Sequence, residues 1–427
     1  YGAYFSEQNP WWPYINKWVD YNARLSYVFQ NTQPVKSIAI LGPTSDLWSE
    51  TGLTRIEFHT QPEYLYKIWE PLSQLGYSCE YLNERVIQNS NFKNGNIHYG
   101  NMSYKALVLA DIRSMHPETA LSIRKFVESG GKIVMVDELP GRSLHLTDHE
   151  ESDEMVQQVF EELLENYSLS VIRVKSPANM NQLMSWTDDF LQRMDLEPDV
   201  WISQPDKDVY QIHQTSDDKV IYFFTNVNRR DSAEFAAKFP VEDKIPYIWD
   251  PETGTREVFP YGSEPEIIDI SLPPLKSMLI VYEKGNEKSG KAPEESSYLK
   301  KSEIDDIWIV TGEHVNGEIY SWEFNELKDI SLAEDRTLNT FAGKLIYETN
   351  FQNKGNISHL DLGEINEGVT EVYINGEKAG FTWYGDAFYY IEPYLKNGSN
   401  ELVIHCTTVL ANYCTSLDDP VARRWAN

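Results

Sequence analysis

The sequence predicts a multidomain protein that joins an α/β region to all-β regions. Its 427 residues exceed what one ordinary hydrophobic core holds, and the 41% that are hydrophobic suffice for several cores. Continuous apolar strands alternate with helical patterns over residues 35–195, whereas short strands separated by turn signals dominate the later residues. We therefore expect about three domains of these two kinds.

The chain opens with a helical pattern that is rich in aromatic residues. Pro10 and Pro13 suit a first helical turn, and the residues 31–34 end the pattern. The apolar positions between them recur at helical spacing: Trp18, Tyr21, Leu25 and Val28. Such an aromatic face has to be covered, either by the next domain or by a neighbour that lies outside this sequence.

Residues 35–195 predict a doubly wound domain of the flavodoxin-like or amidotransferase-like kind. Strands are expected at 36–41, 78–82, 106–110, 132–136 and 170–174, and helices at 63–76, 117–128, 151–167 and 181–193. Apolar strands without alternation, separated by helices, indicate a mostly parallel sheet with both faces covered.

Residues 196–284 predict a small β-sandwich. Its short strands are expected at 209–213, 219–226, 234–239, 245–249, 257–259, 267–270 and 277–282. The stretch 285–304 is rich in Lys, Glu and Ser and poor in hydrophobic residues, so we expect a linker there.

Residues 305–427 predict a jelly roll. Asn375 and Gly376 lie between two alternating runs, which is a strong hairpin signal. Further on, Leu402, Ile404 and Cys406 share one face of a predicted strand. Short strands split by turns are typical of a β-sandwich or jelly roll.

Charge excludes two classes of partner. The chain has 66 Asp and Glu against 37 Lys and Arg, a net charge of −29, which argues against nucleic acid and membrane surfaces. No apolar run approaches the ~18 residues of a membrane span, so no membrane insertion is expected. Neutral glycans remain possible ligands.

No cofactor and no metal site is predicted. Neither of the nucleotide-binding motifs G-x-G-x-x-G and G-x-x-x-x-G-K-[ST] follows a predicted strand. Cys79 lies within a predicted strand and not at the sharp strand–helix turn that a nucleophilic cysteine would need. His145 and His149 have ligand-like spacing, but their neighbours Gly141 and Asp148 favour a solvated loop and helix cap.

Acids follow three of the predicted parallel strands. Asp46, Asp111 and the pair Asp137-Glu138 come after the first, third and fourth strands. Ligands of doubly wound domains usually bind at this edge, so a hydrolase, sugar or metal site is one interpretation. The other is that these residues are helix caps and loop acids of a very acidic protein.

Two segments resemble the region that follows the catalytic barrel in α-L-rhamnosidases. They are Asn9–Trp12 (NPWW) and Tyr21–Arg24 (Tyr-x-x-Arg). The WDPETG turn at 249–254 and the LPPLKS strand at 272–277 resemble the β-domain of the same family, although Gln214 stands where the family commonly has Arg. The resemblance implies an upstream barrel that carries the catalytic carboxylates, with residues 1–34 flanking it. It makes Glu7, Trp11 and Trp12 candidates for the barrel interface.

The predicted jelly roll resembles the galactose-binding-like domain of β-galactosidases and α-L-rhamnosidases. An ordered set of residues carries this likeness: Leu362-Gly363, 372–376, Gly380, Trp383, 394–396, Gly398, Asn400 and 402–404. The likeness implies sugar contact, for which Trp383, Tyr384 and Trp322 could form a stacking platform with Asn412. The alternative is that Trp383 belongs to the core.

The sequence thus predicts an accessory, non-catalytic C-terminal region of a glycoside hydrolase most like an α-L-rhamnosidase. Its partners would be a glycan or oligosaccharide and the barrel of the same protein. A stand-alone carbohydrate-binding protein, or a hydrolase with its site at the strand edge, are the alternatives. The resemblance implies an extracellular or periplasmic bacterial location.

Overall fold

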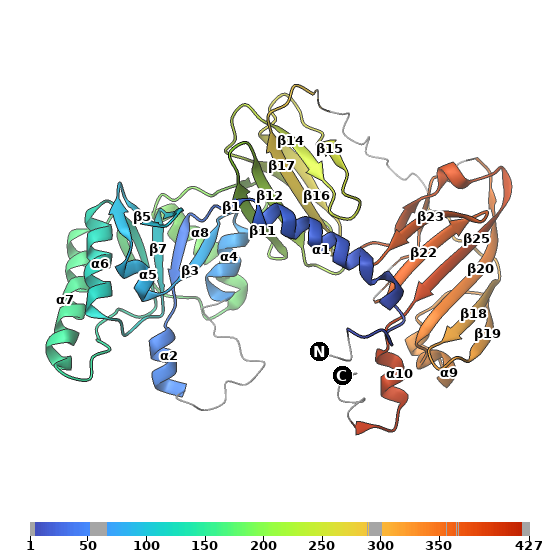
Figure 1. The fold of residues 1–427 in the computed structure, drawn as a ribbon, viewed down its shortest axis with the longest axis horizontal. Helices are drawn as coiled ribbons and strands as arrows, with labels where there is room; N and C mark the ends of the chain where they lie inside the picture. The colour runs from blue at the N-terminus through green and yellow to red at the C-terminus, as the bar shows by residue number, and fades with distance from the viewer. Residues whose placement is uncertain are drawn as a thin grey trace.

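A computed structural model describes residues 5–51, 66–287, 289, 301–355, 357–363, 365 and 367–420. The described elements form a row, with an α/β part at one end, a β-sandwich in the middle and a further β-sheet region at the other end (Figure 1). This arrangement confirms the mixed α/β and all-β composition. Within these residues, no helix combines the length and the apolar character that a bilayer crossing requires.

A five-stranded parallel sheet forms the centre of the α/β part. In spatial order its strands are β3 (Cys79–Leu82), β2 (Ile38–Leu41), β7 (Ala106–Ala110), β8 (Lys132–Val136) and β9 (Val171–Val174). One face packs on α6 (Pro117–Glu128) and α7 (His149–Asn166), and the other packs on α4 (Trp69–Gln74) and α8 (Leu183–Arg193) (Figure 1). Because both faces are covered, the strands are apolar on both sides.

The predicted elements of this part agree well with the observed ones. The strands 106–110 and 132–136 and the helix 117–128 match β7, β8 and α6 residue for residue. The helix predicted at 63–76 corresponds to α4, which ends before Gly76 because that residue has a φ of 85°. The first part of that prediction, up to residue 65, lies outside the described residues.

The structure adds elements that the sequence analysis does not predict. A small antiparallel sheet consists of β4 (Asn91–Lys93), β5 (Asn96–Tyr99) and β6 (Met102–Tyr104). Its first turn holds Asn94 and Gly95 at φ values of 51° and 72°, as a type I′ turn requires. Two short helices, α2 (Thr44–Thr51) and α5 (Glu84–Gln88), are also additional.

The sandwich packs a six-stranded sheet against a three-stranded one. The larger sheet contains β1 (Gln33–Pro34), β11 (Val209–Thr215), β12 (Val220–Asn226), β17 (Ser277–Glu283), β14 (Ile245–Trp249) and β15 (Arg256–Val258). The smaller contains β10 (Trp201–Ile202), β13 (Ala233–Lys238) and β16 (Ile267–Leu272). Aromatic rings fill the space between the two sheets, and the ring centroids of Tyr222 and Phe239 are 4.6 Å apart.

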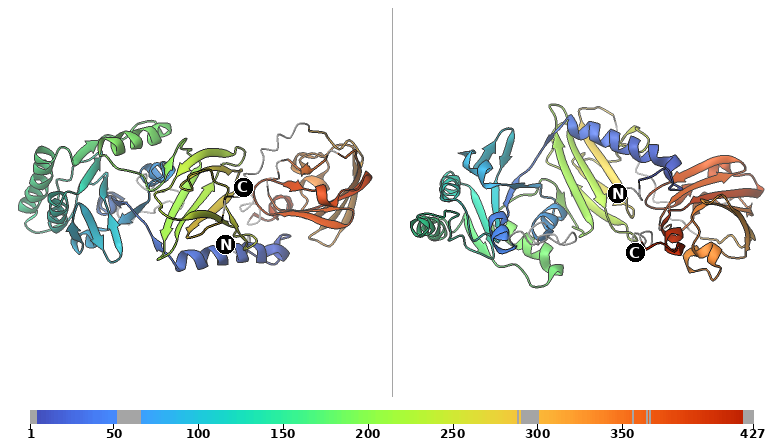
Figure 2. Two further views of the ribbon diagram at one scale, coloured as in Figure 1. Left: turned by 90° about the horizontal axis from the view of Figure 1, so that it is seen from above. Right: turned by 60° about the horizontal axis from the view of Figure 1, so that its bottom comes forward.

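Helix α1 (Ile15–Gln30) lies along the outer face of the larger sheet and reaches towards the C-terminal sheet (Figures 1 and 2). Its Val28 is buried against Ile221, Leu279 and Val281. The residues that follow it form β1, which pairs with β11. The opening segment therefore completes the sandwich before the chain enters the parallel sheet.

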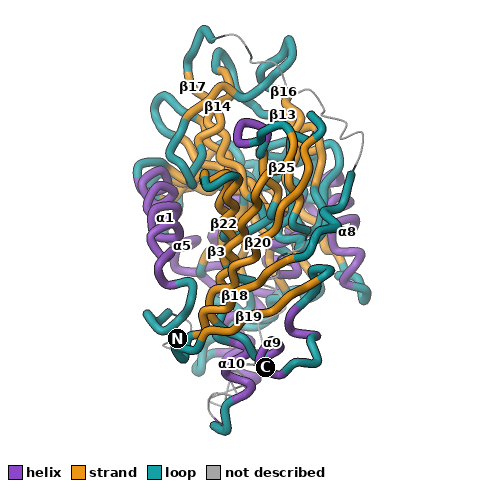
Figure 3. Tube along the Cα trace, turned by 90° about the vertical axis from the view of Figure 1, so that its right-hand side faces the viewer, coloured by secondary structure: helices purple, strands orange, loops and turns teal. Residues whose placement is uncertain are grey.

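The last region is built on a six-stranded antiparallel sheet, which faces the viewer in Figure 3. In spatial order its strands are β19 (Ile319–Phe324), β18 (Trp308–His314), β20 (Gly343–Asn353), β25 (Gly398–Thr407), β22 (Val369–Ile374) and β23 (Glu377–Thr382). The smaller elements are β21 (His359–Asp361), β24 (Phe388–Tyr390), α9 (Arg336–Asn339) and α10 (Ala411–Ser416). The predicted hairpin is confirmed, because Asn375 and Gly376 connect β22 to β23 with positive φ.

Candidate functional site

A cluster of aromatic rings lies at the start of α1, with Trp18 on the helix and Phe5 and the half-buried Trp11 in the segment before it. Phe5 and Trp18 are 55% and 43% exposed, and their ring centroids are 5.7 Å apart. Trp11 lies 6.1 Å from Phe5, because backbone hydrogen bonds around Asn9 turn the chain just before the helix. We call Phe5, Trp11 and Trp18 the aromatic cluster. Grouped exposed apolar side chains of this kind mark interaction surfaces.

The residues predicted for the barrel interface lie at or beside this cluster. Trp11 belongs to it, the ring of Trp12 is 6.0 Å from Trp11, and Glu7 is exposed. Sequence reasoning missed Phe5 and placed Trp18 in one stripe with Tyr21, Leu25 and Val28, to be covered either by the next domain or by a neighbour outside this sequence. Phe5 reaches Trp18 because the chain turns before the helix. Helical periodicity does not predict this turn.

Two of the segments that carry the family likeness, Tyr21–Arg24 and the turn at 249–254, contact each other. The Arg24 guanidinium donates hydrogen bonds to the carbonyl oxygens of Pro251 and Glu252, at 2.8 and 2.7 Å. These residues form the turn between β14 and β15, where Gly254 has a φ of 78°. The motif arginine therefore fixes α1 to the sandwich.

The inner side of α1 meets the C-terminal sheet at Glu371. This buried carboxylate accepts a hydrogen bond of 2.7 Å from the Tyr14 hydroxyl and forms an ion pair with Lys378. Burial raises the pKa of Glu371, but the hydrogen bonds from Lys378 and Tyr14 outweigh it and hold the pKa below its usual value. Burial, followed by the bond to Glu371, raises the pKa of Tyr14 to about 12.

Trp383 and Tyr384 lie at the same junction, where the chain itself covers much of both rings. Tyr21 of α1 contacts them with centroid distances of 5.7 and 6.0 Å, and its hydroxyl is 2.6 Å from the Ser277 hydroxyl of β17. The Lys276 ammonium lies 4.2 Å from the centre of the Tyr384 ring. Both rings therefore pack α1, the sandwich and the C-terminal sheet together.

The structure does not assemble the predicted stacking platform. Trp322 lies on β19, which is the opposite edge of the six-stranded sheet from the β23 edge that Trp383 follows. The Trp322 indole donates to Asp335 at 3.1 Å and its ring stacks on Tyr320. Asn412 lies on α10, whose Tyr413 ring is 4.8 Å from the ring of His314 on β18, the strand next to β19. The strand order, which separates these residues, is not readable from local pattern.

A different set of aromatic rings is exposed in this region. Phe388 and Tyr390 of β24 are 42% and 53% exposed, while Tyr389 between them is buried. The His359 ring stacks on Phe388 with a centroid distance of 5.0 Å and an interplanar angle of 13°. The alternation within residues 388–390 is a strand signal that could have revealed this surface.

The strand-edge acids do come together at the carboxyl edge of the parallel sheet. Asp111 follows β7 and Asp137 follows β8, and both adopt left-handed backbone conformations, with φ values of 55° and 58°. Asp46, in the first turn of α2, is buried and accepts hydrogen bonds from the backbone N–H groups of Arg113 and Ser114. Asp46 therefore orders the loop after β7.

The two central acids differ in their surroundings. Asp137 pairs with Lys67 at 2.9 Å and accepts bonds from the Ser176 amide and hydroxyl, at 2.8 and 2.6 Å. Burial opposes ionisation, but Ser176 and Lys67 together lower the pKa of Asp137. Burial and the nearby Asp137 charge raise the pKa of Asp111, whose carboxylate has no hydrogen bond or ion pair within the described residues. Glu138 is exposed.

One set of three side chains has metal-ligand spacing within the described part of the chain. It consists of His116, Glu118 and His145, whose ligand atoms all lie within 4.8 Å of one another. The sequence analysis considered His145 with His149, but the observed partner His116 comes from the segment before α6.

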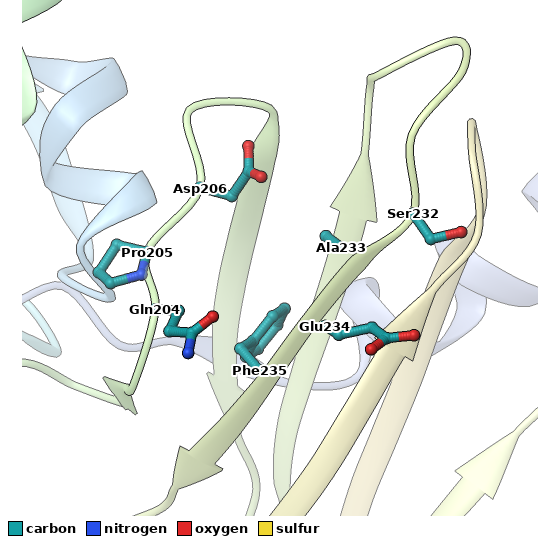
Figure 4. A pocket seen from close by; sticks show the side chains of 7 residues that line it. All are labelled: Gln204, Pro205, Asp206, Ser232, Ala233, Glu234 and Phe235. Atoms are coloured by element: carbon teal, nitrogen blue, oxygen red, sulfur yellow. The ribbon is translucent and has the colours of Figure 1, made fainter. Parts of the chain in front are cut away.

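Two hollows lie on the described surface. A pocket of about 320 Å³ lies on the sandwich and is lined by 204–206 and 232–235, none of which is a predicted site residue (Figure 4). A second, of about 300 Å³, lies between the opening segment and the C-terminal sheet, beside Tyr14, Glu313 and Lys344.

Comparison with known proteins places these features in a family. The profile of glycoside hydrolase family 106, described as alpha-L-rhamnosidase, matches residues 1–263. A provisionally named beta-glucuronidase of Formosa agariphila is 26% identical over 258 residues, which are 60% of this chain and 19% of that protein. The solved rhamnosidase of Novosphingobium sp. PP1Y has a TM-score of 0.64 and 22% identity, over 98% of this chain and 39% of that one.

The chain thus spans 19% and 39% of the lengths of these two relatives, and the second likeness concerns the fold alone. The profile match shows the family, because it covers well over half of the chain. The matched residues include the NPWW segment, Arg24 and the turn that Arg24 binds. The chain belongs to the alpha-L-rhamnosidase family, glycoside hydrolase family 106.

Proposed function

We propose that this chain is a non-catalytic region of an α-L-rhamnosidase-like glycoside hydrolase, which scaffolds the catalytic barrel of the same protein. The observation that carries this proposal is the aromatic cluster at the start of α1, in which Phe5 and Trp18 are exposed. The inner side of the helix is fixed to both β-regions through Tyr14, Tyr21 and Arg24. A helix held in this way presents a rigid apolar surface, as docking partners require.

The barrel is the partner that best fits this surface. The likeness to the Novosphingobium rhamnosidase uses 98% of this chain but only 39% of that protein, so most of the longer chain lies outside the match. The substrate of the whole protein would be a plant or bacterial glycan. Its location would be extracellular or periplasmic, which fractionation of the producing cells would test.

The state of the strand-edge acids supports a non-catalytic role. Glycoside hydrolysis needs two carboxylates with different tasks on either side of the scissile bond. Asp137 is already neutralised by Lys67 and held by Ser176. Asp111 has a raised pKa, as a general acid has, but its acidic neighbour Asp137 is paired with Lys67.

We also propose finer fold assignments. Numbered along the chain, the parallel strands have the spatial order 2-1-3-4-5, which is the flavodoxin-like order. The C-terminal sheets would form a galactose-binding-like jelly roll, a reading supported by the hairpin at Asn375 and by the apolar face of β25.

An activity assay tests the non-catalytic role directly. The purified 427-residue chain should not hydrolyse p-nitrophenyl α-L-rhamnopyranoside or p-nitrophenyl β-D-galactopyranoside. Turnover that Asp111→Asn abolishes, while Glu138→Gln retains it, would instead assign a hydrolase to the strand edge.

Docking is tested in a longer form of the protein that includes a barrel. Trp18→Ser should lower the melting temperature and the rhamnosidase activity that survives heating, because it removes a ring from the contact. Tyr27→Ser is the matched control, since Tyr27 is 70% exposed at the other end of the same helix. Equal effects of the two substitutions would contradict docking through the aromatic cluster.

Stand-alone carbohydrate binding is the second candidate, and the exposed rings of Phe388 and Tyr390 favour it. Flat rings of this kind offer apolar faces for stacking together with polar groups at their edges. Titration with rhamnose- and galactose-containing oligosaccharides would test it. Loss of binding in Tyr390→Ala, but not in Trp322→Ala, would support it, and no binding to any of these sugars would refute it.

A further inference from the structure

We infer that His116, Glu118 and His145 form a Zn²⁺ site at the outer end of the α/β part. The inference goes beyond the scaffolding role and does not depend on it. His116 and Glu118 come from the start of α6, and His145 comes from the loop before α7. Their ligand atoms lie within 4.8 Å of one another, although the residues are far apart in sequence.

Backbone hydrogen bonds hold the two ligand-bearing segments side by side. The amides of Gly141 and Arg142 donate to the Arg113 carbonyl at 3.0 and 3.1 Å, and the Met115 amide donates to the Arg142 carbonyl at 3.0 Å. Ser114 and Arg142 form a parallel β-bridge. The spacing between His116 and His145 is therefore set by the fold and does not depend on chance contact of two loose loops.

Side-chain contacts fix each segment further. The Glu84 carboxylate accepts a 2.7 Å hydrogen bond from the His116 amide, just before α6 begins. The Asp153 carboxylate accepts a hydrogen bond from the Ser143 amide, which anchors the other segment to α7. A preformed site needs less ordering when the ion binds, so these contacts favour affinity.

The orientation of the His145 ring suits a ligand. Its Nδ1 lies 3.0 Å from the Ser152 hydroxyl, which leaves Nε2 to bind an ion. Metal-binding histidines usually carry such a partner on their second ring nitrogen, and the partner fixes the tautomer. His116 is half-buried, while Glu118 and His145 are exposed, so an ion would have access from solvent.

The chemistry of the three ligands favours Zn²⁺ over Ca²⁺ and Mg²⁺. Two imidazoles and one carboxylate suit Zn²⁺, whereas Ca²⁺ and Mg²⁺ prefer oxygen ligands throughout. Tetrahedral Zn²⁺ with bonds near 2.0 Å separates its ligand atoms by about 3.3 Å, so the side chains must close slightly from the observed spacing. The exposed Glu118 and His145 side chains can rotate to do so, and the fourth position is left for water. The net charge of −29 concentrates cations around the protein.

Calorimetric titration of the tag-free, EDTA-treated chain with ZnCl₂ at pH 7.5 tests the site. We expect one ion per chain, and His145→Ala and Glu118→Gln should each weaken binding by about tenfold or more. His149→Ala is the matched control, because this exposed histidine lies four residues further on and outside the set. Glu118→Gln keeps the size of an exposed helix residue, so it serves even if His145→Ala fails to fold.

Two outcomes would overturn the inference. One is the absence of saturable Zn²⁺ binding, and the other is binding that His149→Ala weakens more than His145→Ala does. Hydrogen exchange should slow over residues 139–148 when Zn²⁺ is added.

Discussion

Glu371 at the α1 junction and Asp111 at the sheet edge are both acids placed where separate elements meet, but their surroundings differ. Glu371 is buried and accepts from Tyr14 and Lys378, with His405 3.6 Å away. Asp111 has no such partner within the described residues, and its neighbour Asp137 takes the available lysine, Lys67. As a result the pKa of Glu371 is lowered and that of Asp111 is raised.

The different surroundings of Glu371 and Asp111 distinguish an acid that stabilises the fold from one that does not. An acid with a full set of donors stabilises the fold and has no bonding capacity left for a ligand. An acid with an unfavourable charge environment lowers stability and is typical of sites that await a ligand. The junction at Glu371 thus stabilises the fold, whereas Asp111 at the strand edge has an unfavourable charge environment that its surroundings do not offset.

The largest effect should come from removing the junction acid. Glu371→Ala leaves the Tyr14 hydroxyl and the Lys378 ammonium without their acceptor, and we expect a loss of about 2–3 kcal/mol of stability. Urea unfolding followed by tryptophan fluorescence would measure it, because Trp383 lies at the junction. A loss below about 0.5 kcal/mol, the size of a surface substitution, would show that the junction is not held by this acid.

At the sheet edge, Asp137→Asn should cost about 1–2 kcal/mol, because it removes the ion pair with Lys67 and weakens the bonds from Ser176. Asparagine tolerates the left-handed backbone at this position, so the change tests charge alone. Hydrogen exchange of peptides from β8 and β9 would report the local loss. Unchanged exchange there would remove the contrast between Asp137 and Asp111.

Acid should weaken the junction, by less than the removal of Glu371 does. The folded-state pKa of Glu371 is lowered, so its stabilisation is complete above the unfolded-state value of about 4.3 and is lost as the pH falls through the folded-state value. Unfolding free energies between pH 6 and pH 3 would show this for the wild type. Glu371→Gln should have a flatter profile, and parallel profiles would contradict the assignment.

The smallest effect has the opposite sign. The folded-state pKa of Asp111 is raised, so its ionised form disfavours folding at neutral pH, and Asp111→Asn should stabilise the protein. Because Asp111 is exposed, we expect no more than about 0.5 kcal/mol. The matched comparison is Asp137→Asn, which has the same chemistry at a neighbouring left-handed residue. Destabilisation by both changes would show that Asp111 has a partner after all.

Local pattern was enough for the parallel sheet and not for the sites. Residues 106–110 form an uninterrupted apolar run, and Gly130-Gly131 stops the next helix, so strand and helix bounds were readable. The small sheet around Asn94 and Gly95 was missed despite its turn signal, because its strands are short and polar. Periodicity identifies a covered face but does not identify what covers it.

The site residues depended on contacts across the chain. The acids at 111 and 137 were predictable because parallel strands end at one edge. The positions of Trp322 and Trp383 depended on strand order, and the pairing of His116 with His145 depended on backbone bonds between two loops. Neither the strand order nor the bonds between these loops can be predicted from the pattern of neighbouring residues.

The packing of α1 on β12 and β17 has a consequence for how this protein is made. The ribosome releases α1 long before the strands β12 and β17 that bury Val28, and the whole parallel sheet is synthesised in between. Until those strands are synthesised, the apolar stripe of α1 therefore stays exposed and can bind chaperones or pack incorrectly. A fragment cut to contain only residues 196–284 would inherit the same exposed surface from the other side, and we expect it to aggregate.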